Sequence, residues 1–174
     1  MQKCKPLIAE VGSCVESFAT GRFRFPALQR AWCDAAYWLH EALAEPLDSI
    51  EVAKLETSLE VLVRAESSVG SERRMLTILE TFYGLRPDDP IADGVTMTAE
   101  QFARRVVGDR SQILHGTSST LNSRPTSSRE GLVDFAIAVI RRTVGELEGY
   151  ALTTSPEDNI DDFLVWVRFC LSKT

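Results

Sequence analysis

The residues best suited to chemistry lie in one short segment, Arg110-Ser111-Gln112-Ile113-Leu114-His115-Gly116, which holds one of the two histidines of the chain. A histidine with an ordinary pKa of about 6.5 can accept or donate a proton near neutral pH. An arginine is a permanently charged, planar partner for phosphate, and the hydroxyl of Ser111 can orient either group. This set suits phosphodiester cleavage without a metal ion, in which His115 moves a proton and Arg110 stabilises charge developing on the phosphate.

Helical spacing separates the members of this set. At about 100° per residue, Ser111 and His115 share one face of a helix, whereas Arg110 and His115 diverge by about 140°. Arg110 and His115 could share a site if the helix frays near Gly116, or if two copies of the chain meet there. A simpler interpretation is that Gly116 ends the helix and His115 interacts with the negative end of the helix dipole. The spacing alone leaves these interpretations open.

The segment resembles the Arg-x4-His signature of HEPN domains, and its form is close to the branch called Apea-like HEPN. A second match is Ile50–Val63, which resembles a helix of that branch that ends in a Leu-Glu-x-Leu run, here Leu59-Glu60-Val61-Leu62. The order of helices, signature, polar loop and long final helices also fits, so the resemblance covers roughly Pro26 to Tyr150. One departure is that the branch often has an aromatic residue shortly before the arginine, where this chain reads Val-Val-Gly-Asp.

The resemblance implies an all-α, HEPN-like helical bundle that forms a homodimer, with the Arg-x4-His segments of both copies lining one cleft. It implies a metal-independent endoribonuclease in which Arg110 and His115 are the active residues and Ser111 is a polar helper. The 2′-hydroxyl of the RNA substrate would attack the adjacent phosphate and leave a 2′,3′-cyclic phosphate, with no cofactor. Many relatives act in phage defence or as toxins, so a toxin–antitoxin setting with an inhibitory partner protein is also expected.

Two alternatives remain beside the nuclease. Some HEPN domains are catalytically inactive and serve as nucleotide-binding or dimerisation and assembly modules. The chain could also be a purely structural interaction domain, whose signature residues only cap a helix. Other HEPN domains are modified on a tyrosine two positions after the histidine, but this chain has Thr117 there, which disfavours that role.

The composition of the 174 residues, 44% hydrophobic and 25% charged, is typical of one water-soluble domain with a sizeable core. A net charge of −6 argues against a wholly basic nucleic-acid binder, although a locally basic site is compatible with it. Arg104 and Arg105 could extend the positive patch beside Arg110 and bind substrate, or could simply be solvated. The scattered cysteines have no CxxC spacing, so no metal site is expected. No apolar run is long enough for a membrane span or a signal peptide, so the expected location is the cytoplasm, without membrane contact.

Hydrophobic periodicity predicts a bundle of about five to seven helices, divided into an N-terminal helical extension (1–25) and a HEPN-like helical domain (26–174). The predicted helices span 7–18, 26–44, 49–66, 70–83, 99 into the Arg-x4-His segment, 131–150, and from 156 onward. Pro26 is expected at the first position of its helix, and Thr98 with Gln101 is expected to form a capping box at the start of the helix from 99. Ser49 is expected as a helix N-cap, and Glu157 and Asp158 in the first turn of the last helix. Glu60 is expected to be a solvent-exposed charge, with the alternative that it reaches toward the catalytic face. The wide apolar surface of the last helix suggests a subunit interface.

Overall fold

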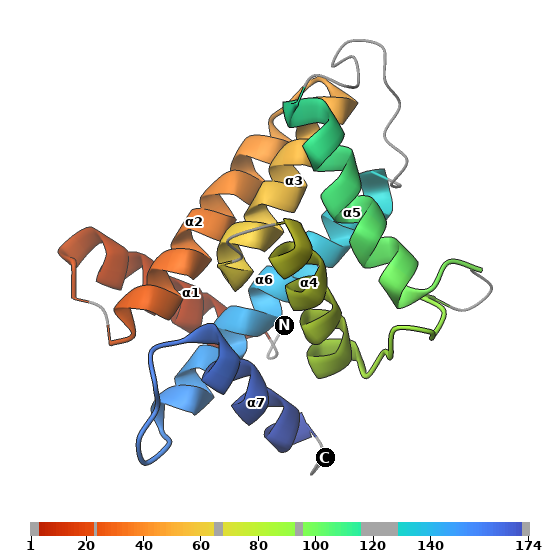
Figure 1. Cartoon of the computed structure of the whole chain (residues 1–174). Helices are drawn as coiled ribbons and strands as arrows, with labels where there is room; N and C mark the ends of the chain where they lie inside the picture. The colour runs from red at the N-terminus through yellow and green to blue at the C-terminus, as the bar shows by residue number, and fades with distance from the viewer. Residues whose placement is uncertain (1–3, 23, 65–67, 93–95, 116–128, 172–174) are drawn as a thin grey trace.

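Seven α-helices make up the described part of the chain, which in this computed structural model comprises residues 4–22, 24–64, 68–92, 96–115 and 129–171 (Figure 1). Their bounds are α1 Cys4–Thr20, α2 Pro26–Leu43, α3 Asp48–Val63, α4 Ser68–Tyr83, α5 Ala99–Leu114, α6 Arg129–Ala151 and α7 Ile160–Leu171. Within these residues the only β-type pairing is an isolated bridge between Pro90 and Thr98. The prediction of an all-α bundle of five to seven helices is therefore confirmed.

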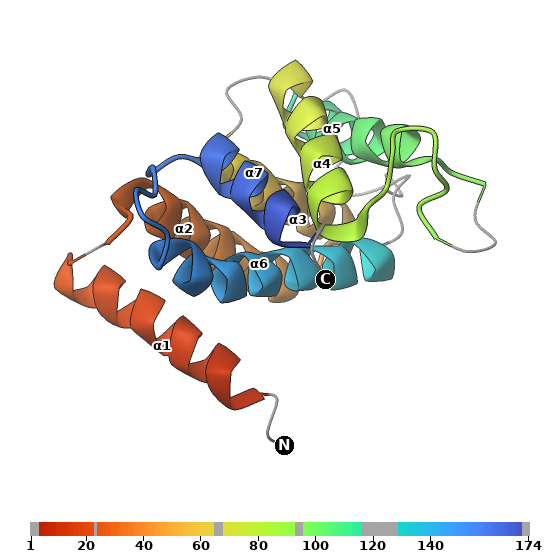
Figure 2. The same cartoon turned by 90° about the horizontal axis from the view of Figure 1, so that it is seen from below.

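The helices are arranged around α3 and α6. Helices α2 and α3 pack along each other, and α5 packs against both α3 and α4. Helix α6 contacts α1, α2, α3, α4 and α7, and it runs beneath α2 and α3 in the view of Figure 2. Helix α1 and helix α5 lie on opposite sides of the molecule in both views. The helix that carries the Arg-x4-His segment thus packs mainly on α3 and α4 and is remote from the N-terminal helix.

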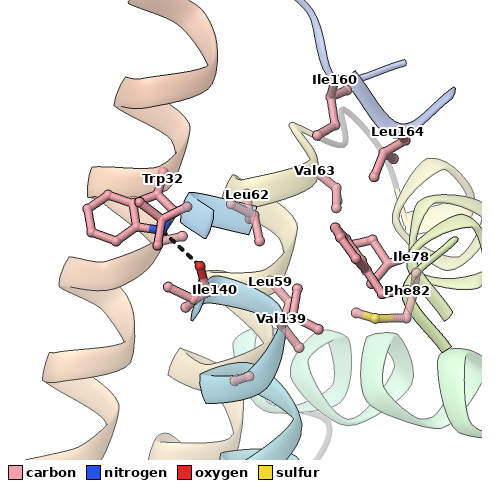
Figure 3. Close-up of a cluster of buried hydrophobic side chains, with 14 of the residues drawn as sticks. Trp32, Leu59, Leu62, Val63, Ile78, Phe82, Val139, Ile140, Ile160 and Leu164 are labelled. Atoms are coloured by element: carbon pink, nitrogen blue, oxygen red, sulfur yellow. Dashed lines mark hydrogen bonds between the residues drawn. The ribbon is translucent and has the colours of Figure 1, made fainter. Parts of the chain in front are cut away.

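The hydrophobic core takes side chains from all seven described helices, and Figure 3 shows part of it. It includes Trp32 of α2, Leu59 of α3, Ile78 of α4, Val139 of α6 and, from α7, Leu164 and its neighbours. Burying a side chain of this size stabilises the fold by about 1.5–3 kcal/mol. The Trp32 indole Nε1 donates a hydrogen bond of 2.9 Å to the carbonyl of Ile140, which satisfies the polar atom of this large ring. From α5, Ala99, Ala103 and Val106 belong to the same core.

Local signals in the sequence set several helix ends. Pro26 is the first residue of α2, as its missing N–H favours. Thr98 and Gln101 form the predicted capping box at the start of α5, with hydrogen bonds of 3.2 and 3.1 Å. Gly84, at φ +69, ends α4. The prediction for Ser49 is wrong, because α3 begins one residue earlier and Ser49 is buried inside it.

Asp158 does not belong to the first turn of the last helix, because α7 begins only at Ile160. Its carboxylate instead caps a different helix. Oδ2 accepts a hydrogen bond of 2.7 Å from the N–H of Ala27, and Oδ1 accepts one of 3.0 Å from the N–H of Leu28. The first N–H groups of a helix have no partner inside the helix, and they attract negative charge. Asp158 therefore ties the segment before α7 to the start of α2.

Part of the apolar surface of the outer helices is left out of the core. On α7, Phe163 and Val167 are fully buried, whereas Val165 and Phe169 are 68% and 57% exposed. On α1, Ile8 is similarly exposed. None of the helices in the described residues is long and apolar enough to cross a membrane.

Candidate functional site

The Arg-x4-His segment lies at the C-terminal end of α5, and the helix is regular as far as Leu114. The helix extends to Leu114, and His115 is its C-cap, whose N–H donates a hydrogen bond of 3.0 Å to the carbonyl of Ser111. Because the helix does not fray before His115, Arg110 and His115 leave it in directions about 140° apart. The side chain of His115 is exposed, whereas that of Arg110 is 29% exposed. A single copy of the chain therefore does not aim both groups at one point.

Arg110 is held by a carboxylate from α3. Its Nη1 forms an ion pair with Oε2 of Glu60, whose side chain is only 13% exposed. The other oxygen of Glu60 accepts a hydrogen bond from the hydroxyl of Ser71 on α4. The expectation of a solvent-exposed Glu60 is wrong, because its side chain is largely buried and points to Arg110 of α5. A charge at a partly buried place is stable only when it is paired, and the packing of α3 against α5 supplies the partner.

Two acidic residues lie in the interior beside this pair. Glu56 on α3 is 1% exposed, and Asp109 on α5 is also buried. Burial, and then the charge of Asp109, raises the pKa of the Glu56 carboxyl to about 10, an effect that nearby Arg110 opposes without cancelling. Among the described residues, neither oxygen of Glu56 has a hydrogen-bond partner, and the buried Nε of Arg110 has none either. Burial thus favours the neutral form of the Glu56 carboxyl, whereas the Glu60 carboxylate forms an ion pair with Arg110.

A groove of about 740 Å³ lies at the Arg110–Glu60 pair. Its walls come from the first turns of α2, from the second half of α3 and from Arg110 of α5. The charged groups that line it are Arg30, Arg64, Arg110, Asp34, Glu60 and Asp158. Arg64 is the C-cap of α3 and has a left-handed backbone conformation, with φ 51 and ψ 47. Three guanidinium groups from three elements thus face one open, polar groove.

Arg104 and Arg105 line a different groove, of about 670 Å³, together with Gln101, Gln112 and other residues of the region. The Arg104 side chain forms ion pairs with Glu72 at 3.4 Å and Glu100 at 3.1 Å. The structure therefore does not bring Arg104 and Arg105 into the groove of Arg110, and carboxylates offset part of the charge of Arg104. Ser111 and His115 line neither of these two grooves.

Glu56 and Arg64 lie at the candidate site but were not predicted from the sequence. The signal for Glu56 was present, because it lies on the same helical face as the apolar residues Val52, Leu59 and Val63. A carboxylate on a buried face indicates an internal polar site. For Arg64 no local signal exists, because a left-handed residue after a helix is usually glycine.

The loop 117–128, with Thr117, lies outside the described residues. Among the residues that are described, no group of three or more histidine, cysteine, aspartate or glutamate side chains could hold a metal ion. No protein-family model, curated protein or solved structure matches this chain.

Proposed function

We propose that the chain is a metal-independent endoribonuclease of HEPN type, whose site is assembled from Arg110 and His115 of two copies. The observation that carries the proposal is their placement on α5. His115 is exposed at the end of the helix, and Arg110 reaches the edge of a polar groove five residues earlier. Since the two side chains diverge by about 140° on one helix, a second copy is needed to bring an arginine and a histidine to the same phosphate.

In the proposed reaction the 2′-hydroxyl oxygen of the RNA bonds to the adjacent phosphorus, and the bond from phosphorus to the 5′ oxygen breaks. A histidine takes the proton of the 2′-hydroxyl, and the leaving 5′ oxygen receives a proton, for which the second His115 of the homodimer is available. Arg110 stabilises the charge that develops on the non-bridging oxygens. Ser111, one turn before His115, orients one of these groups. The products are a 2′,3′-cyclic phosphate and a 5′-hydroxyl.

The ion pair between Glu60 and Arg110 favours a second candidate. An arginine that is already neutralised by a carboxylate has less attraction for phosphate, as is typical of a structural pair. The domain would then be a catalytically inactive nucleotide-binding or dimerisation module of the HEPN type.

The cellular setting that we propose follows from the resemblance. A nuclease of this kind would act in the cytoplasm, in phage defence or as the toxin of a toxin–antitoxin pair, and an inhibitory partner would restrain it. The exposed apolar side chains of α1 and α7, among them Ile8 and Val165, are available for contact with a second copy or with that partner.

The deciding experiment is the cleavage of total RNA by purified protein in EDTA, with the wild type compared with His115→Ala. The matched control is His40→Ala, because His40 is the other histidine and is exposed on α2. Cleavage by the wild type and by His40→Ala, but not by a folded His115→Ala of unchanged oligomeric state, is the expected result. Cleavage by His115→Ala would reject the proposed site. No cleavage by any of the three, with nucleotide binding retained, would favour the inactive module.

A further inference from the structure

We infer that the groove lined by Arg30, Arg64 and Arg110 binds the phosphate backbone of a single-stranded RNA. In this inference Arg64 and Arg30 hold the strand beside the phosphate that Arg110 contacts. It rests on the proposed ribonuclease function and adds two substrate-binding residues to it. Arg104 and Arg105, the residues expected from the sequence to bind substrate, line another groove.

The first support is that arginines from three separate elements line the same groove. Arg30 comes from the second turn of α2, Arg64 from the end of α3 and Arg110 from the second half of α5. The side chains of three separate elements reach one groove, so tertiary packing and not local sequence clusters the positive charge. Guanidinium groups are planar donors that match phosphate oxygens, and a row of them is the usual means of holding a nucleic-acid backbone.

The second support is the backbone of Arg64. A left-handed conformation is costly for a residue with a Cβ, and glycine would occupy it at little cost. The conformation is fixed by hydrogen bonds from the N–H of Arg64 to the carbonyls of Glu60 and Val61. The chain therefore keeps an arginine, exposed and on the wall of the groove, at a place where stability alone favours glycine. Such local strain is characteristic of residues that serve binding or catalysis.

The third support is that two of the three acidic residues of the groove, Glu60 and Asp158, are engaged by protein groups, while the third, Asp34, is exposed. Glu60 is paired with Arg110, and both oxygens of Asp158 accept hydrogen bonds from the start of α2. Their negative charge is thereby offset by protein groups. Among the other charged residues of the lining, the two arginines Arg30 and Arg64 outnumber the one remaining carboxylate, Asp34.

The shape and lining of the groove favour a strand over a small anion. A volume of about 740 Å³ is within the range of sites that take ligands of many atoms, and the groove is open to solvent. None of the described residues that line it is aromatic, so this part of the groove offers bases no ring on which to stack. We therefore expect contacts to phosphate, which position a strand without reading its sequence.

The test measures the fluorescence anisotropy of a short, fluorescein-labelled RNA that carries a 2′-O-methyl group on every nucleotide, so that it lacks the attacking hydroxyl. Arg64→Gln and Arg30→Gln are compared with Arg141→Gln, an exposed arginine of α6 that does not line the groove. Each groove variant is expected to weaken binding about three- to tenfold at low salt. The slope of the logarithm of the binding constant against the logarithm of the salt concentration should become shallower by about 0.7. The control changes the net charge equally and is expected to leave both quantities near the wild-type values.

Arg64→Gly gives a second readout that does not depend on a loss of folding. Glycine relieves the left-handed backbone, so the melting temperature is expected to stay unchanged or to rise by about 2–4 °C while RNA binding falls. Equal binding by the wild type, both glutamine variants and Arg64→Gly would overturn the groove assignment, even if His115-dependent cleavage were observed. Weaker binding in the groove variants without any His115-dependent cleavage would support the groove and reject the nuclease.

Discussion

Glu60 of α3 and Arg110 of α5 form an ion pair whose carboxylate is also bound by the hydroxyl of Ser71 on α4. One carboxylate thus connects three helices at the edge of the groove. The direction of the Arg110 guanidinium is set by this bond as well as by the position of Arg110 on its own helix.

Removing the charge of Glu60 is expected to destabilise the protein. Glu60→Gln leaves the partly buried Arg110 without its ionic partner, so we expect a loss of about 1–3 kcal/mol in the free energy of unfolding, below the cost for a fully buried pair. The matched control is Glu80→Gln, which breaks an exposed pair with Arg168 at 2.8 Å and should cost less than about 1 kcal/mol. Urea unfolding measures both, and equal losses would contradict a special role for Glu60.

Glu56 makes the stability depend on pH. Its pKa is raised from an ordinary value of 4.5 to about 10, so the folded protein keeps a proton that the unfolded chain releases. This proton contributes fully to the free energy of unfolding below the pKa that Glu56 has in the unfolded chain. The contribution is lost as the pH rises toward 10.

Glu56→Gln removes this dependence, since an amide does not titrate. We expect the variant to gain stability relative to the wild type between about pH 5 and about pH 8, by at most about 1.4 kcal/mol per pH unit. Denaturant unfolding of the wild type and of Glu56→Gln at the two pH values gives the difference between their free energies of unfolding. A constant difference between the two proteins would show that Glu56 is ionised in the fold.

Loss of the carboxylate at Asp158 should weaken the start of α2. Asp158→Ala removes the acceptor for the N–H groups of Ala27 and Leu28, and a lost helix cap costs about 0.5–2 kcal/mol. Asp158→Asn retains one oxygen acceptor and should lose less. Thermal unfolding of the two variants tests the order, and an alanine variant as stable as the wild type would refute the capping role.

Two glycines of α6 should respond in opposite ways to alanine. A Cβ at Gly149 would lie 2.9 Å from the indole of Trp166, so Gly149→Ala should destabilise by about 1–3 kcal/mol through overpacking. At Gly145 the nearest contact is an ordinary 3.6 Å from a carboxylate oxygen of Glu10. There alanine should stabilise by about 0.4–1 kcal/mol, because it restricts the unfolded chain. Melting temperatures that move in the same direction would contradict this contrast.

The parts of the fold that were predicted correctly depend on local sequence. Apolar periodicity gives the helices, Pro26 gives the start of α2, and the pattern of Thr98 and Gln101 gives the start of α5. The role of Asp158 could not be predicted in the same way. Its partners are about 130 positions earlier in the chain, and only the packed fold brings them together.

The candidate site also has some features that can be predicted from local sequence and others that depend on how the helices pack. The types of Arg110 and His115 and their divergence on a helix can be read from the sequence. The partner of Arg110 cannot, because it depends on how α3 packs against α5. Arg104 and Arg105 are near Arg110 in sequence, yet the turn of the helix places them on another groove. Arg64 is far from Arg110 in sequence and shares its groove.

The cap that Asp158 places on α2 has a consequence for where the domain can be cut. The segment that resembles HEPN domains ends near Tyr150, but Asp158 lies beyond that point and forms part of the groove wall. A fragment that stops at residue 150 would retain the three arginines and lose both this wall and the last helix. A fragment that is to keep this groove after transfer to another protein should therefore extend through α7.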